Sequence, residues 1–396
     1  MRAHVAAGRP RYAVADLFAG AGGLRLGFEM AFGPDAQVEF VSEWDGYARK
    51  TYLANFPGPE KIFGDAERIG PDDLPPIDVC LASLPRPPKK GRSPRPQALR
   101  LRRPMARALE GEPWHSPALP VCDFETPRPG YRMGGPGAGA LRCAVPDDGQ
   151  SEDALAMPFS AVARVCAAAR PKLLLCEGSD AWLKKAPSSG LSRFCDALAK
   201  MGYKTRLAAL DSSEFGVAQS RRRMYLVAFL AHWDRGDFCF PKGAQGAQGA
   251  RLRDVLEERA ADKYFLSERS YQALMGRGDR SQGSSQFGFQ IRDLEGLSGP
   301  MRPGGMGRER NLIVDPRRHA RALPRLANRE GVRKLTPREC ARLQGFPDSF
   351  ELPVSDSRLY EQLCKTATVS VARSVAAEAK RTLDAASVRR SELSDG

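Results

Sequence analysis

The sequence, 396 residues long, predicts an α/β fold with a doubly wound parallel sheet and a small irregular second domain. Three observations predict it. Apolar runs of strand length alternate with amphipathic helical segments between residues 12 and 83, and this alternation resumes after residue 155. Glycines separate the first strand from the first helix. Such alternation is typical of parallel strands joined by crossover helices.

The expected elements follow one another along the chain. Apolar, β-branched runs predict strands, and runs with a helical apolar period predict helices. The expected strands are 12–18, 37–45, 77–83, 172–178 and two more within 204–230, which a polar loop joins. The expected helices are 20–32, 46–56, 155–170 and 191–203.

Composition divides the chain into a large domain, a small one and a C-terminal helical segment that packs back on the large domain. The expected bounds are 12–234, 235–330 and 331–387, followed by a frayed polar tail at 388–396. In the helical segment, Thr336 is the expected N-cap and Pro337 the first helical residue. Residues 86–150 interrupt the large domain. They are rich in Pro, Arg and Gly without a sustained period, which predicts an irregular basic stretch.

The composition limits the classes of partner and site. A net charge of +14 suits a polyanion such as nucleic acid, although a generally Arg-rich proteome would give the same excess. No apolar run is long enough to span a membrane, and no apolar block of a signal peptide precedes residue 12, so we expect a cytoplasmic protein. With nine scattered cysteines, no Cys-x-x-Cys pair and four histidines, we expect reduced thiols and no metal site.

Three features at the ends of the first strands predict a nucleoside cofactor. The stretch ADLFAGAGGLRLGF, residues 15–28, places glycines where the backbone must turn sharply and where a helix N-terminus offers free N–H groups. Glu43 ends the next strand, where an acid typically holds ribose hydroxyls. Asp65, after the third strand, is a candidate partner of an adenine amino group. Ordinary caps and turns are the alternative, and the three features together favour the cofactor.

Five motifs, in order and spacing, resemble those of the DNA cytosine-5 methyltransferases. They are DLFAGAGGLRLGF (16–28), VSEWDGYARKTYLANF (41–56), GDAERI (64–69), FGVAQSRRRMYLVAF (215–229) and KLTPRECARLQGFPDSF (334–350). The resemblance spans roughly residues 12–378 without 86–150. It implies the fold of S-adenosylmethionine-dependent methyltransferases, and methyl transfer from that cofactor to C5 of cytosine in double-stranded DNA.

The resemblance also implies roles for individual residues. In the family a cysteine of a Pro-Cys motif attacks C6 of a cytosine that is flipped out of the duplex. A glutamate holds the base, here Glu177, and two arginines help bind it and its phosphate, here Arg221 and Arg223. Trp44 either stacks on the adenine or only packs. The implied cofactor-binding residues are Phe18, Ala19, Gly20, Gly22, Gly23, Leu24, Glu43, Trp44 and Asp65, of which Phe18, Gly20, Gly23 and Leu24 serve the methionine and the turn.

The stretch DVCLASLPRPPKKGRS, residues 78–93, departs from the family pattern at the nucleophile. Pro85 is present, but the next residue is Arg86 instead of cysteine. A guanidinium stays protonated and cannot attack C6, although its charge can attract a DNA phosphate. The resemblance therefore implies binding of the cofactor and DNA, with methyl transfer in doubt.

Other motif positions depart on the side of the base and the target. Glu-Asn-Val, Gly-Asn and Thr-Leu of the family read Glu177-Gly178-Ser179, Cys364-Lys365 and Met301-Arg302. The positions of the other cysteines give little reason to expect one of them to replace the nucleophile. Cys80 lies inside a strand and is expected in the core, whereas Cys122 and Cys143 fall in the irregular stretch.

The irregular stretch 86–150 permits several origins. Its Arg, Pro, Gly and Ala bias is what a GC-rich gene gives when read out of frame, which suggests a frame-disrupted copy or a later insertion. A functional basic loop is the alternative. If the chain binds DNA, the arginines of 92–103 would add a salt-dependent term that is independent of DNA sequence.

Three functions stay open at this point. The first is a catalytically silent homologue that binds S-adenosylmethionine and DNA, with an active methylase or a restriction endonuclease as a candidate partner. The second is an active DNA cytosine-5 methyltransferase of a restriction-modification system, which uses a displaced thiol. The third is a decayed copy without a fixed role. Restriction-modification context is implied by the family alone.

Overall fold

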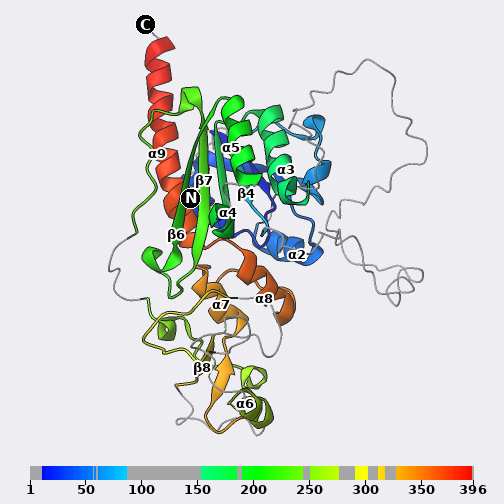
Figure 1. Cartoon of the computed structure of the whole chain (residues 1–396), viewed down its shortest axis with the longest axis vertical. Coiled ribbons are helices and arrows are strands. Elements are labelled where there is room, and N and C mark those ends of the chain that lie inside the picture. Colours follow the sequence, from blue (N-terminus) through cyan, green and yellow to red (C-terminus); the bar gives the residue numbers. More distant parts are fainter. Residues whose placement is uncertain are drawn as a thin grey trace, which may run out of the picture. The chain divides into compact units, whose positions relative to one another are not determined.

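The structure is a computed structural model, shown in Figure 1. It describes residues 11–56, 58, 61–86, 153–184, 190–243, 250–275, 290–301, 311–316 and 327–394, without the side chains of 61, 153–157 and 389–394. Most of the stretch 86–150 therefore lies outside the described residues, and the expectation of an irregular loop there stays a prediction.

A seven-stranded sheet lies at the centre of the large domain, in the order β3-β2-β1-β4-β5-β7-β6 (Figure 1). Its strands are β1 Tyr12–Leu17, β2 Ala36–Ser42, β3 Lys61–Phe63, β4 Val79–Ser83, β5 Leu173–Ser179, β6 Tyr203–Asp211 and β7 Arg222–Leu230. Five neighbouring strands of the sheet run parallel to one another, namely β3, β2, β1, β4 and β5. This confirms the predicted fold class.

Strand β7 is the exception to the expected parallel sheet, because it runs antiparallel to both β5 and β6. The reason lies in the connection between β6 and β7. A short loop with a single 3-10 turn, Ser212–Phe215, joins them in place of a crossover helix, so the chain can only return as a hairpin.

Helices cover both faces of the sheet (Figure 1). Helices α1 Gly23–Phe32, α2 Gly46–Asn55 and α9 Val369–Ser394 contribute to one core, and α3 Asp153–Ala169, α4 Ala181–Lys184 and α5 Gly190–Lys200 to the other. Successive residues of β1 divide between the faces, since Val14 joins the first core and Ala15 the second. Within the described part of the chain, no helix has both the length and the apolar composition that crossing a bilayer needs.

Helix α9 continues through the tail that was expected to fray after residue 388, and it ends only at Ser394. Residues 384–394, DAASVRRSELS, contain neither Gly nor Pro, and Ala, Arg, Glu and Leu are good helix formers. Nothing in this run therefore stops the helix, although its polarity suggested a tail.

The small-domain region contains a two-stranded antiparallel sheet of β8 Leu312–Val314 and β9 Val332–Lys334, with helix α6 Glu268–Met275 beside it. Short strands and loops were expected here. Strand β9 lies just beyond residue 330, where the C-terminal segment was expected to begin, and the domain bounds stay a prediction. Helices α7 Pro337–Leu343 and α8 Asp356–Lys365 follow.

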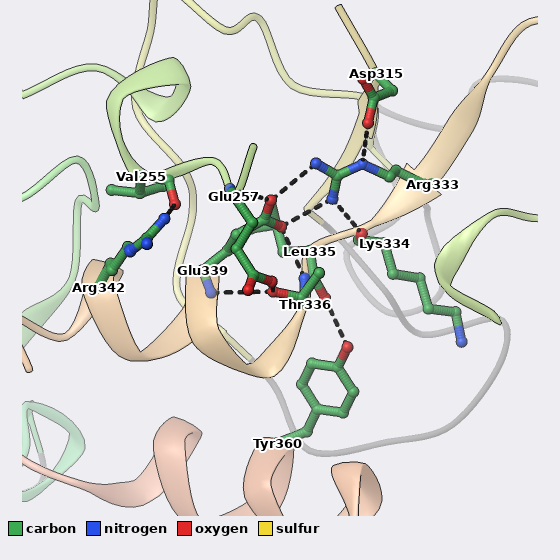
Figure 2. A network of polar contacts seen from close by, with 10 residues as sticks. All are labelled: Val255, Glu257, Asp315, Arg333, Lys334, Leu335, Thr336, Glu339, Arg342 and Tyr360. Atoms are coloured by element: carbon green, nitrogen blue, oxygen red, sulfur yellow. Dashed lines mark hydrogen bonds and ion pairs between the residues drawn. The ribbon is translucent and has the colours of Figure 1, made fainter. Parts of the chain in front are cut away.

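A buried ionic network fastens the small sheet to α7 (Figure 2). Arg333 of β9 is fully buried, and its guanidinium contacts Asp315 at 2.7 Å and both carboxylate oxygens of Glu339 at 2.8 Å. Glu339 also accepts from the Thr336 N–H at 2.8 Å, and Thr336 caps α7 as predicted. The backbone N–H of Glu257 donates to Glu339 as well, at 3.0 Å. One arginine thus joins β8, β9 and α7.

Candidate active site

The loop between β1 and α1 has the conformation that the glycine motif predicted. Phe18, Gly20 and Gly22 lie in the left-handed region, with φ values of 55°, 60° and 85°. The Gly22 N–H donates to the Ala19 carbonyl at 2.9 Å, which closes the turn. Gly22 is the N-cap of α1, and among the described residues no side-chain hydrogen bond caps the helix. An uncapped helix N-terminus is what an anion site requires.

The three glycines of this turn serve different purposes. A Cβ on Gly22 would lie 2.2 Å from the Phe56 ring, and one on Gly23 would lie 2.4 Å from Thr366 Oγ1 and 2.5 Å from the Ala367 carbonyl oxygen. Packing alone therefore requires glycine at both positions. At Gly20 the nearest described atom would be 4.0 Å away, so this side of the turn is open to a ligand.

Glu43 binds the glycine turn directly. Its Oε2 accepts from the Gly20 N–H at 2.8 Å, and its Oε1 accepts from the Asp45 N–H at 2.7 Å. Burial raises the pKa of this carboxyl, while the two backbone donors oppose that rise. Two residues that the sequence assigned to one cofactor, 23 positions apart, are thus in contact.

The other predicted cofactor residues lie in different surroundings. Trp44 follows Glu43 and is 55% exposed, so its side chain is accessible to a ligand. Leu24 is buried in the core, which leaves only its backbone for a ligand. Asp65 caps the turn Ala66–Arg68 by accepting from the Glu67 N–H at 3.0 Å. Its adenine role stays a prediction.

Arg86 stands beside the predicted base site. Strands β4 and β5 pair Ser83 with Glu177, and the Leu84 N–H donates to the Glu177 carbonyl at 2.7 Å. The Trp182 indole N–H fixes the Pro85 carbonyl at 3.1 Å. The chain therefore leaves β4 next to Glu177 and presents exposed Arg86 there.

Glu177 and Arg223 form a buried ion pair across β5 and β7, with 2.8 Å between Arg223 Nε and Glu177 Oε1. Tyr225, opposite Glu177 in the register, is also buried. Its hydroxyl has no hydrogen-bond partner among the residues that the structure describes. The surroundings of Glu177 therefore offer charged and polar atoms that a base edge can pair with.

Arg221 is placed differently from Arg223, although both were predicted to bind the base. Its Nη1 donates to Gln344 Oε1 at 3.1 Å and to Thr368 Oγ1 at 3.4 Å, and its Nη2 donates to the Cys364 carbonyl at 3.2 Å. Burial, and then the charge of Arg223, lower the pKa of Arg221 to about 9. These contacts belong to the protein itself, and the role in base binding stays a prediction.

Two described thiols bear on the missing nucleophile. Cys80 is fully buried in β4, as predicted, and its hydrogen bond to Cys166 together with burial raises its pKa well above the usual value. Cys364 is also buried, and burial raises its pKa, but the charges of Arg86, Lys365, Arg221 and Arg223 oppose this rise. Sequence reasoning noted Cys364 only as a motif change and missed that it lies near these cations.

The sheet order, the glycine turn and the strand-end acid Glu43 define an α/β protein of the S-adenosylmethionine-dependent methyltransferase class. The profile of one family, C-5 cytosine-specific DNA methylase, matches residues 12–87 and 150–381. The chain belongs to this family. The gap between the two matched ranges falls within the predicted irregular stretch.

Individual relatives agree with the family. The type II methyltransferase M.NlaX of Neisseria lactamica is 29% identical over 382 residues, which cover 96% of this chain and 99% of that protein. M.HpaII of Haemophilus parainfluenzae is 28% identical over 369 residues, covering 91% and 87%. The structure of the S. pombe Dnmt2 methyltransferase, at 18% identity, has a TM-score of 0.59 and covers 94% of this chain and 98% of its own. At that identity the likeness shows the fold.

The methyl donor of this family is S-adenosylmethionine. The residues present fit it. The open side of Gly20 and the uncapped start of α1 suit the methionine part, while Glu43, Trp44 and Asp65 are available for the nucleoside.

Proposed function

We propose that this chain is a homologue of the type II DNA cytosine-5 methyltransferases that binds S-adenosylmethionine and double-stranded DNA, and in which methyl transfer is impaired. Arg86 carries the proposal, because it occupies the position of the nucleophile beside Glu177. When bound, the cofactor supplies an electrophilic methyl group. Without a thiolate on C6, C5 of cytosine is a poor nucleophile toward that methyl group.

The remaining residues support binding of both ligands. Glu43 can accept the ribose hydroxyls, and Glu177 with Arg223 can pair with the edge of a flipped base. Arg86 adds a positive charge at the mouth of this site, where a DNA phosphate can lie. The net charge of +14 favours the same partner. An active methylase or a restriction endonuclease that shares the DNA site is the partner we propose.

The test combines binding with chemistry. We expect calorimetric titration to give saturable one-site binding of S-adenosylmethionine in the micromolar range. We expect no transfer of labelled methyl to DNA by the wild type and measurable transfer by Arg86→Cys. Arg86→Ser is the control, because serine has nearly the size of cysteine but forms no thiolate. Transfer of labelled methyl by the wild-type protein would contradict the impairment.

A second candidate function is an active enzyme with a displaced thiol. The observation that favours it is the position of Cys364 near four positive charges, which oppose the rise in its pKa that burial causes. In that case labelled methyl transfer by the wild type should vanish in Cys364→Ser and persist in Cys80→Ser. Persistence in both variants would exclude these two thiols. Cys122 and Cys143, which lie outside the described residues, would then be tested in the same way.

The third possibility, a decayed copy without a role, predicts poor folding and no stabilisation by the cofactor. If the cofactor site works, the protein should melt cooperatively. S-adenosylmethionine at 100 times its dissociation constant should stabilise it by about 2.7 kcal/mol. A broad melt that the cofactor does not shift would favour the decayed copy. Differential scanning calorimetry with and without the cofactor distinguishes the two.

A further inference from the structure

Two buried arginines, one in β7 and one just before it, hold the short segment in which α8 ends and the chain leads into α9. This segment comprises residues 364–368. Arg221 Nη2 donates to the Cys364 carbonyl at 3.2 Å, and Arg223 Nη2 donates to the Lys365 carbonyl at 3.1 Å. More than 140 residues separate the donors from these acceptors, so the contacts are entirely tertiary.

The 364–368 segment also covers the glycine turn. The place where Gly23 would carry a Cβ is filled by Thr366 Oγ1 at 2.4 Å and by the Ala367 carbonyl oxygen at 2.5 Å. The first turn of α1 therefore rests on this segment without any gap. A shift of the segment by a fraction of an ångström must move the helix N-terminus or open a space beside it.

Gln344, just after α7, completes the attachment. Its Nε2 donates to the Leu363 carbonyl at 2.8 Å, and its Oε1 accepts from the Thr368 hydroxyl at 2.9 Å and from Arg221 Nη1 at 3.1 Å. Arg221 thus contacts both ends of the 364–368 segment. It also contacts the side chain of Gln344, which itself holds the residues around this segment.

The hydrogen bonds of Arg221 connect separate parts of the protein. It is 4% exposed, and within the described part of the chain the hydrogen bonds of its guanidinium go to Gln344, Thr368 and Cys364. Arg223, by contrast, also pairs with the carboxylate of Glu177. Three of the five guanidinium N–H donors of Arg221 are therefore occupied by acceptors of the protein itself, which a ligand would have to displace.

We propose that Arg221 is a positioning residue for S-adenosylmethionine, which acts by holding the 364–368 segment against the first turn of α1. The cofactor site then depends on an arginine that the motif alone assigns to the base. The inference rests on the proposed cofactor site, because the first turn of α1 is where that ligand would lie.

The experiment compares Arg221→Met and Arg221→Lys with Arg222→Met in the full-length protein. Arg222 is the matched control, since it is the next residue and is exposed. By calorimetry we expect S-adenosylmethionine to bind at least tenfold more weakly to Arg221→Met and by an intermediate amount to Arg221→Lys. Lysine keeps the charge but cannot span the three acceptors. Binding to Arg222→Met should stay within twofold of the wild type.

Hydrogen exchange of the free proteins separates positioning from general destabilisation. In Arg221→Met, amides of 364–369 and of 22–26 should exchange faster, while those of β5 should stay as in the wild type. Unchanged exchange at 364–369, or unchanged affinity in a folded Arg221→Met, would overturn the inference. The exchange result stands even if the wild type binds no cofactor, which would refute only the proposed function.

Thr368→Val provides a milder variant if Arg221→Met does not fold. It removes one acceptor of Arg221 at nearly constant volume. We expect at least threefold weaker cofactor binding and faster exchange at 364–369, because the hydroxyl loses its hydrogen bond from Arg221 and its hydrogen bond to Gln344. Wild-type cofactor affinity together with wild-type exchange at 364–369 would contradict the positioning role of Arg221.

Discussion

Asp16 shows how much a single buried group can control. It lies in β1, fully buried, and accepts a hydrogen bond from the Tyr52 hydroxyl at 3.0 Å. Arg25 donates to the same hydroxyl at 2.8 Å and pairs with Glu29 at 2.7 Å. Burial raises the pKa of Asp16 to about 7, and the charge of Arg25 only partly offsets this. Such a carboxyl titrates near neutral pH, two residues before the glycine turn.

This raised pKa predicts a loss of stability as pH rises. The folded-state pKa of about 7 exceeds the ordinary value of 3.8, so the folded state binds the proton more tightly than the unfolded state. The stability that protonated Asp16 contributes to the folded state is fully present below about pH 4 and is lost as pH rises through 7. Between these limits the wild-type free energy of unfolding should fall by up to about 4 kcal/mol relative to Asp16→Asn.

Urea unfolding at pH 5 and pH 8 measures the part of this fall that lies above pH 5, about 3 kcal/mol. Asp35→Asn is the control, because the hydrogen bond to Lys380 lowers the pKa of Asp35. Its effect therefore belongs to acidic pH and should not change between 5 and 8. If the free energies of unfolding of the wild type and of Asp16→Asn changed equally between pH 5 and pH 8, Asp16 would have to be ionised in the folded protein throughout this range.

At the scale of the element, the start of α1 combines two requirements. The turn needs a left-handed residue at Gly22, and the helix needs no side chain at Gly23, because the 364–368 segment occupies that space. The glycine motif looks like a ligand signature in the sequence. In the structure, close packing accounts for part of it, as it does at Gly27, where a Cβ would meet that of Ala372 at 2.6 Å.

Gly23→Ala should therefore destabilise the protein and weaken cofactor binding together. We expect a loss of about 1–3 kcal/mol in the free energy of unfolding, as overpacked sites give. Gly46→Ala is the matched control. It also lies at the first residue of a helix, but its Cβ would meet nothing closer than 3.7 Å. Urea unfolding and calorimetry on both variants check this, and a stable Gly23→Ala with wild-type affinity would contradict the packing argument.

At the scale of the whole molecule, the network of Figure 2 connects parts of the chain that local sequence keeps apart. Arg333, Asp315 and Glu339 are all buried, and the Tyr360 hydroxyl of α8 donates to the Leu335 carbonyl beside them at 2.6 Å. Removal of the arginine takes away the positive charge that pairs with two buried carboxylates, which costs far more than loss of a surface pair.

Arg333→Met should lower the free energy of unfolding by about 3–5 kcal/mol. The matched control is Arg381→Met, whose exposed ion pairs with Glu378 and Asp237 contribute little. Thermal melts followed by circular dichroism check both variants. We expect an unchanged midpoint for Arg381→Met, and an unchanged midpoint for Arg333→Met would mean that the network does not hold the small sheet.

The sequence alone determined the α/β class, the capped start of α7 and the chemistry of position 86. Periodicity fixes which residues face a core, Thr336 caps a helix through its own neighbours, and a guanidinium is no nucleophile in any fold. It also assigned Glu43 and the glycine turn to one cofactor. That role stays a prediction, and the structure brings the two into contact because the ends of adjacent parallel strands meet.

Only the tertiary structure decided the direction of β7, the burial of Cys364 near four cations and the hydrogen-bond partners of Arg221. Both Arg221 and Arg223 belong to one motif, and nothing local distinguishes them. Their difference arises from acceptors more than 120 residues away, at Gln344 and Cys364. Contacts of this kind depend on how whole elements pack, and a single sequence carries no periodic signal for them.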